Sequence, residues 1–123
     1  MTTKTEIKTA QIPDDVRVYV SEIIDALRRA LETGDFTVEI LYDNIAIKIP
    51  DIKAYVDNKK LYIIYKDIDI VYSDYVTKVK VFRDLHDDPD VYYAHDYWNA
   101  LYELHELAKQ KVREIIEKAL RKL

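Results

Sequence analysis

The chain has 123 residues, of which 49% are hydrophobic and 34% are charged, and its formal net charge is −4. This mixture is typical of a folded domain with a solvated surface, and a chain of this size has room for one core. We therefore expect a single domain over residues 1–123, with residues 1–12 as a flexible N-terminal tail.

The composition excludes several classes of function. Because the chain has no cysteine, it cannot form disulfides, thiolate metal sites or iron–sulfur clusters. The single glycine, Gly34, excludes the glycine-rich loops that bind dinucleotides and nucleoside triphosphates. No apolar run approaches the roughly 20 residues of a membrane-spanning helix, and the polar N-terminus does not resemble a secretory signal. We expect a cytoplasmic protein without a cofactor.

The first predicted element is a helix over residues 14–33. Apolar residues from Val16 to Leu31 recur at intervals of three and four, which draws one stripe on a helix. Pro13 suits the first turn, and Gly34 can adopt the left-handed conformation that ends a helix.

The middle of the chain changes to a period of two, which is typical of strands. Pairs rich in Asp and Asn, such as Asp43-Asn44 and Asp57-Asn58, separate the apolar runs and favour tight hairpin turns. We expect a five-stranded antiparallel meander over residues 36–42, 45–49, 52–56, 62–72 and 78–81.

A second, long helix is predicted to begin at Asp88-Pro89-Asp90 and to continue to Leu123. Asp88 can cap this helix and Pro89 fits its first position. About 34 residues would make it roughly 50 Å long, whereas a compact domain of this size is about 35 Å across. The fold class is therefore α+β, a two-layer sandwich in which the long helix extends beyond the sheet.

The end of the long helix suggests an interaction surface. Its apolar stripe needs a partner where the sheet no longer covers it, and an aromatic cluster near its start adds a second candidate surface. The predicted interface residues are Trp98, Tyr102, Ile115, Ile116, Leu120 and Leu123. The leading hypothesis is a non-catalytic interaction module that forms a homodimer and binds another protein. The alternative is that the long helix bends, or that the first helix packs beside it and covers the same apolar stripe, so that no partner is needed.

The outer face of the sheet suggests a different function. Lysines that alternate with a tyrosine can imitate the platform on which single-stranded nucleic acid stacks. The candidate residues are Lys48, Lys53, Tyr55, Lys78 and Lys80. Ordinary strand composition is the competing explanation, since tyrosine favours strands and lysine protects exposed faces. The acidic net charge and the nearby Asp67 and Asp69 make nucleic acid a less favoured partner than protein.

A third hypothesis is a small metal-dependent hydrolase at the acidic loop. Its ligands would be His86, Asp87, Asp88 and His95, because carboxylate and imidazole groups bind divalent ions. No HExxH pattern or other metal-binding spacing accompanies them.

The composition also resembles that of proteins from thermophilic archaea and their viruses or plasmids. Glycine is scarce and cysteine is absent, whereas isoleucine, tyrosine, lysine and aspartate are abundant. In that setting, an interaction module could act on a complex of the host cell.

Overall fold

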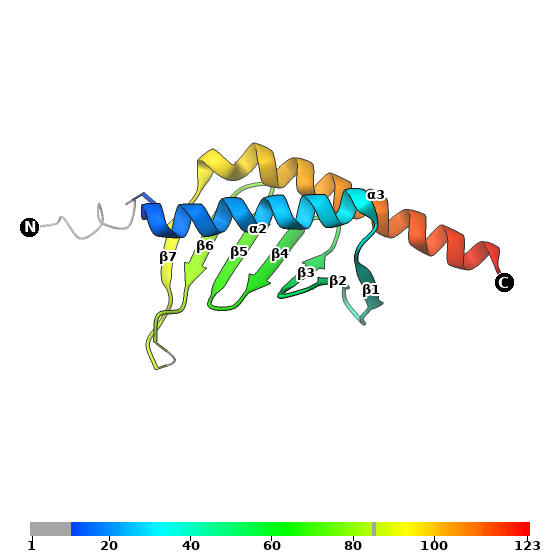
Figure 1. Ribbon diagram of the computed structural model, residues 1–123, viewed down its shortest axis with the longest axis horizontal. Coiled ribbons are helices and arrows are strands. Elements are labelled where there is room, and N and C mark those ends of the chain that lie inside the picture. The colour runs from blue at the N-terminus through cyan, green and yellow to red at the C-terminus, as the bar shows by residue number, and fades with distance from the viewer. Residues whose placement is uncertain (1–10, 85) are drawn as a thin grey trace, which may run out of the picture.

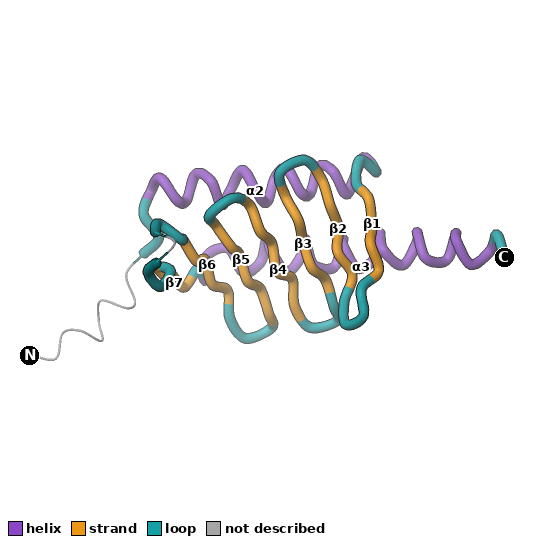
Figure 2. The backbone as a smooth tube through the Cα atoms, turned by 90° about the horizontal axis from the view of Figure 1, so that it is seen from below, coloured by secondary structure: helices purple, strands orange, loops and turns teal. Residues whose placement is uncertain are grey.

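The computed structural model describes residues 11–84 and 86–123 and consists of two layers (Figure 1). One layer is a seven-stranded antiparallel sheet. The other consists of the helices α2 (Asp14–Thr33) and α3 (Trp98–Arg121), which lie side by side on the same face of the sheet (Figures 1 and 2). The predicted α+β fold, with a helix at each end of an antiparallel sheet, is confirmed.

Helix α2 has the predicted bounds. Its buried residues form one stripe that includes Val20, Leu27 and Leu31. Gly34 ends the helix with φ 85°, and its N–H donates to the carbonyl of Ala30. Glycine adopts this left-handed conformation without the steric cost that other residues meet.

The chain joins the core before α2 begins. Ile12 is only 4% exposed and packs in the core, so the predicted tail over residues 1–12 is too long at its C-terminal end. The rest of that predicted tail, residues 1–10, lies outside the described residues.

The sheet is a meander in which every strand pairs only with its neighbours in sequence (Figure 2). Short turns connect antiparallel neighbours at most positions, as the Asp- and Asn-rich pairs predicted. The strands are β1 (Thr37–Ile40), β2 (Ile45–Ile49), β3 (Ile52–Val56), β4 (Lys60–Tyr65), β5 (Ile68–Ser73), β6 (Thr77–Val81) and β7 (Asp90–Tyr93).

The single long strand predicted over residues 62–72 is wrong. A tight turn divides this segment into β4 and β5, and Lys66 adopts φ 52° within the turn. The turn also changes which side chains face the helices. Tyr62 points to the outer face, whereas Ile70 on the next strand points into the core.

The predicted start of the second helix is also wrong. Residues 90–93 instead form the edge strand β7, which pairs with β6. A short 3-10 helix, η1 (His95–Tyr97), follows, and α3 begins only at Trp98 without a side-chain cap. Helix α3 therefore has 24 residues, which makes it about 36 Å long.

The core lies between the two helices and the inner face of the sheet, which is the face that the helices cover. It includes Leu27 of α2, Ile63 and Ile70 of the sheet, and Leu101 of α3. Burial on α3 ends at Val112. The last turns of α3 extend past β1 (Figure 1), so the predicted overhang is present although the helix is shorter.

Within residues 11–84 and 86–123, no helix combines the length and the apolar character that crossing a membrane requires.

Candidate functional site on the outer face of the sheet

The outer face of the sheet is the face opposite the helices. Figure 2 shows the strands in front and both helices behind them. Within residues 11–84 and 86–123, no helix or strand packs over this outer face. Antiparallel sheets commonly leave one face to solvent, so the side chains on it decide whether it is an ordinary surface or a binding surface.

Strand register arranges the outer side chains in two rows. The first row contains Ala46, Tyr55, Tyr62, Val71 and Lys78, each opposite the next on the neighbouring strand. The second row contains Lys48, Lys53, Ile64, Asp69 and Lys80. Directly opposed side chains have Cβ atoms about 5 Å apart. Tyr55 and Tyr62 are therefore immediate neighbours in the middle of the sheet.

Positive charge gathers on this face although the whole chain has a net charge of −4. Its strands present five outward lysines, namely Lys48, Lys53, Lys60, Lys78 and Lys80. Only two carboxylates, Glu39 and Asp69, accompany them on outward strand positions. The lysines therefore outnumber the acids at the outward strand positions.

Both carboxylates are already engaged. Glu39 forms an ion pair with Lys48 at 2.8 Å, and this hydrogen bond lowers the pKa of Glu39. Asp69 is 8% exposed and accepts a hydrogen bond from the hydroxyl of Tyr62 at 2.7 Å. Because Lys48 is paired with Glu39, the positive charge left over on the outward strand positions comes from Lys53, Lys60, Lys78 and Lys80.

The hydroxyl of Tyr62 is held in its neutral form. Partial burial, together with the hydrogen bond to Asp69, raises the pKa of Tyr62 to about 12. A phenolate beside a carboxylate would be repelled, so the proton stays between them. The hydrogen bond also fixes one end of the Tyr62 ring on the sheet.

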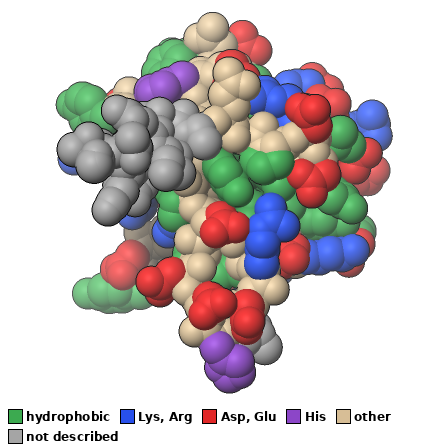
Figure 3. Space-filling model, turned by 90° about the vertical axis from the view of Figure 1, so that its left-hand side faces the viewer, with side chains coloured by type: hydrophobic (Ala, Val, Ile, Leu, Met, Phe, Trp, Pro, Cys, Tyr) green, Lys and Arg blue, Asp and Glu red, His purple; other side chains and the backbone are tan. Residues whose placement is uncertain are grey.

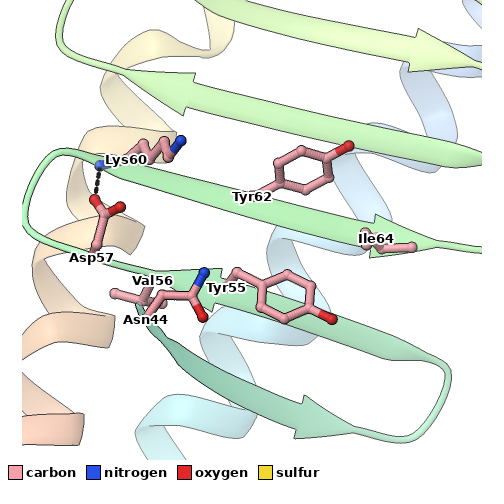
Figure 4. A pocket seen from close by; sticks show the side chains of 7 residues that line it. All are labelled: Asn44, Tyr55, Val56, Asp57, Lys60, Tyr62 and Ile64. Carbon is pink, nitrogen blue, oxygen red and sulfur yellow. Dashed lines mark hydrogen bonds between the residues drawn. The ribbon is translucent and has the colours of Figure 1, made fainter. Parts of the chain in front are cut away.

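Two adjoining hollows lie on the outer face. The first has a volume of about 230 Å³ and is lined by Asn44, Tyr55, Asp57, Lys60 and Tyr62, among others (Figure 4). The second, of about 370 Å³, is lined by the lysines Lys48, Lys53 and Lys66 together with Tyr55. Because Tyr55 and Ile64 line both, the two hollows adjoin, and we refer to them together as the outer depression.

The tyrosine rings form the floor of this depression. In Figure 4 the rings of Tyr55 and Tyr62 lie side by side and point in the same direction along the strands. The ammonium group of Lys53 lies 5.7 Å from the centre of the Tyr55 ring, which is within the range of a cation–π contact.

The structure brings together all five residues that the sequence suggested for nucleic-acid binding. Lys48, Lys53, Tyr55, Lys78 and Lys80 all occupy outward positions on β2, β3 and β6. Asp67, which we expected among them, lies instead in the turn after β4.

The sequence reasoning missed three contributors, Lys60, Tyr62 and Ile64. It missed Tyr62 and Ile64 because it extended one strand through Lys66 and so placed both side chains in the core. Recognising a turn at Lys66-Asp67 would have placed both side chains on the outer face.

The predicted interface residues form two separate groups on α3. Trp98 and Tyr102 lie at its start, where their rings stack 5.3 Å apart. Ile115, Ile116 and Leu120 lie near its end and Leu123 just after it, and the exposed fractions of Leu120 and Leu123 are 60% and 100%. A separation of 13 residues or more corresponds to about 20 Å along a helix. The two groups therefore do not form one surface.

The aromatic cluster that we expected near the start of α3 is also divided. Tyr92 packs against the core, whereas Tyr93 lies on the outer face below the ammonium group of Lys78. Tyr97 shares a hydrogen bond of 3.1 Å with Ser21 of α2. Tyr97 and Tyr92 thus contribute to packing, and a single aromatic patch is absent from the described structure.

The residues proposed as metal ligands are not assembled into a site. Carboxylates and a histidine gather at the protruding end shown in Figure 3, which is the loop between β6 and β7. His86, Asp87 and Asp88 belong to this loop, whereas His95 follows the opposite end of β7. Among the described residues, no group of three or more His, Asp or Glu side chains is placed to hold a metal ion.

Comparison with known proteins gave no relative. No family model, no curated protein sequence and no solved structure matched the chain.

Proposed function

We propose that this protein binds single-stranded nucleic acid through the outer face of its sheet. The observation that supports this proposal is the presence of five lysines and two adjacent tyrosine rings on one bare sheet face. Stacking of a base on an aromatic side chain contributes about 1–3 kcal/mol and needs no particular sequence. Lysines around such rings neutralise the phosphates that connect the bases.

The distribution of charge favours this ligand over a second copy of the same face. Two outer faces brought together would oppose one set of five lysines to another, and like charges across an interface are unfavourable. A polyanion such as nucleic acid would instead bring negative phosphates to these lysines, which is favourable. Since the chain as a whole is acidic, the remaining surface would repel nucleic acid and leave the outer face as the preferred contact.

The first test is fluorescence anisotropy with a labelled eight-nucleotide oligothymidine at several salt concentrations. The double variant Lys53→Gln/Lys80→Gln should bind at least about tenfold more weakly at 50 mM salt, and the slope of log K against log salt should fall by about 1.4. Lys118→Gln/Lys122→Gln, on the end of α3, is the matched control and should bind like the parent protein. Absence of binding by the parent protein at low salt would contradict the proposal.

Stacking is tested separately from charge. Tyr55→Ala should weaken binding by roughly fivefold to a hundredfold and leave the salt slope unchanged, because the ring carries no charge. A change in slope without a change in low-salt affinity would indicate that the ring does not contact a base.

A second candidate function is self-association through the end of α3. Leu120 and Leu123 are exposed where α3 extends beyond the sheet, and Ile115 and Ile116 continue the same stripe. An isologous dimer of two such ends would bury these side chains. Light scattering after size exclusion should then give twice the chain mass, and Leu120→Asp should restore the monomer with an unchanged circular dichroism spectrum. A monomer at all concentrations would contradict this candidate.

A further inference from the structure

The first hollow differs from the rest of the outer face because polar groups line one end of it. Asn44, Asp57 and Lys60 stand at this end, and the rings of Tyr55 and Tyr62 extend away from them (Figure 4). The second hollow, in contrast, has three lysines and one aspartate in its lining, together with isoleucines and Tyr55. One depression thus combines a polar, ring-floored end with a cationic end.

The turn after β3 holds Asp57 in a defined orientation. One carboxylate oxygen, Oδ1, accepts hydrogen bonds from the backbone N–H groups of Lys59 at 2.8 Å and Lys60 at 2.9 Å. The carbonyl of Asp57 contacts Nε2 of the buried His105 at 2.7 Å, which ties the turn to α3. The second oxygen, Oδ2, accepts no hydrogen bond from the rest of the described chain and remains an acceptor at the end of the hollow.

We infer that this hollow is a subsite for one guanine base of the bound strand. The inference rests on the proposed function. A base stacked on Tyr55 or Tyr62 would direct its Watson–Crick edge toward Asn44, Asp57 and Lys60.

Guanine fits the chemistry of this end better than the other bases. Its N1–H and N2–H groups are adjacent donors that suit the oxygens of Asp57 and Asn44, and its O6 accepts from the ammonium group of Lys60. Thymine offers one N–H between two carbonyl oxygens, which a carboxylate repels. Adenine and cytosine each offer a single amino group and are intermediate.

The adjoining lysines complete the subsite. Lys48, Lys53 and Lys66 line the second hollow, which shares Tyr55 with the first. A nucleotide whose base lies on Tyr55 would place the neighbouring phosphates within reach of these ammonium groups. The first hollow would therefore hold the base, and the adjoining second hollow would hold the phosphates next to it.

The experiment compares labelled eight-nucleotide strands that differ at one position. The parent strand is oligothymidine, and the test strands carry one central guanine, adenine or cytosine. The parent protein should bind the guanine strand roughly fivefold to a hundredfold more tightly than oligothymidine, because one good base contact discriminates by about that factor. Adenine and cytosine should lie between them.

Asp57→Asn tests the residue that we assign to the guanine edge. Asparagine keeps the oxygen that accepts the turn N–H groups, so the turn is retained, but it replaces the free acceptor by a donor. The preference for guanine should disappear while the affinity for oligothymidine is unchanged or higher. Asp43→Asn is the control, because it makes the same change at an aspartate that does not itself line the hollow, although its neighbour Asn44 does.

The outcomes separate the two proposals. If the parent protein binds oligothymidine and the guanine strand equally well, the guanine subsite is wrong and the nucleic-acid function stands. If the preference persists in Asp57→Asn and the thermal midpoint shows that this variant is folded, Asp57 does not read the base and the assignment is overturned. If neither strand binds at low salt, the proposed function fails and the subsite fails with it.

Discussion

The two faces of the sheet are made from the same strands but have opposite character. The inner face contributes Ala54, Ile63, Ile70 and Val79, all at most 1% exposed, to the core. The positions next to them along each strand form the outer face, where lysine and tyrosine stand beside Ile64, Asp69 and Val71. Because successive side chains of a strand alternate between faces, residues that form the core and residues of the proposed binding surface alternate along each strand.

This separation means that the outer face can be changed without unfolding the protein. The inner face depends on close packing, in which the loss of a few methyl groups is costly. Apart from the hydrogen bond between Tyr62 and Asp69, the outer face presents exposed charges and ring surface, which contribute little to folding. Two neighbouring residues on one strand, one on each face, can therefore be substituted as a matched pair to test whether the two faces differ in this way.

The largest expected effect is on stability. Ile70→Ala should reduce the free energy of unfolding by about 2–5 kcal/mol, because it leaves a cavity in the core. Val71→Ala, on the next residue and the opposite face, should reduce it by about 1 kcal/mol or less. Urea denaturation measures both. Equal losses would show that the outer face is also packed against something.

The next effect compares two tyrosines that point to opposite faces. Tyr62→Phe removes the hydrogen bond to the nearly buried Asp69 and should destabilise the fold by about 1–3 kcal/mol.

Tyr72→Phe is the inner-face counterpart. In the described structure the Tyr72 hydroxyl is buried without a hydrogen-bond partner. Removing it should change the unfolding free energy by about 1 kcal/mol or less, in the stabilising direction. Thermal denaturation of both phenylalanine variants measures the contrast, and a larger loss for Tyr72→Phe would reverse our account of the two hydroxyls.

The pH dependence at the alkaline end gives a smaller effect. The pKa of Tyr62 is about 12 in the folded protein, whereas an unperturbed tyrosine has a pKa of about 10. Because the unfolded chain loses this proton first, the contribution is intact below pH 10 and is lost as the pH rises toward 12. Urea midpoints between pH 9 and 12 should therefore fall more steeply for the parent protein than for Tyr62→Phe. Parallel curves would contradict this assignment.

The smallest expected effect concerns the charge of the outer face. Glu39→Gln removes the ion pair with Lys48 and one of the two outer carboxylates. Affinity for oligothymidine should rise by roughly twofold to fivefold at low salt, because a rim charge acts mainly through screened electrostatics. Stability should hardly change, since exposed ion pairs contribute little. A loss of affinity would place the strand away from this edge.

Regular patterns in the sequence predicted the fold well. The apolar stripe from Val16 to Leu31, followed by Gly34, defined α2 correctly. The hairpins at Asp43-Asn44 and Asp57-Asn58 were found because these residues favour turns. The outward lysines of β2, β3 and β6 followed from alternation alone.

Two local signals misled the prediction. Lys66 is not a usual turn residue, yet it adopts a positive φ because pairing of β4 with β5 outweighs the local cost. Asp88-Pro89-Asp90 resembles a helix start, but pairing of Val91 and Tyr92 with β6 continues the sheet instead. Both errors arise from tertiary contacts that short-range propensity does not contain. Because of the first error, Tyr55 was predicted on the outer face but its neighbour Tyr62 was not.

The neighbour-to-neighbour order of the strands has a consequence for how the protein folds. Hairpins form in about 1–10 μs, so the sheet can assemble from local steps as the chain is synthesised. Its inner face stays partly uncovered until α3 has been made. At about 5–20 residues per second, the 24 residues of α3 take roughly one to five seconds. During that interval the part of the apolar layer that α3 will cover is open to other chains, and aggregation or chaperone binding can compete with folding at this stage.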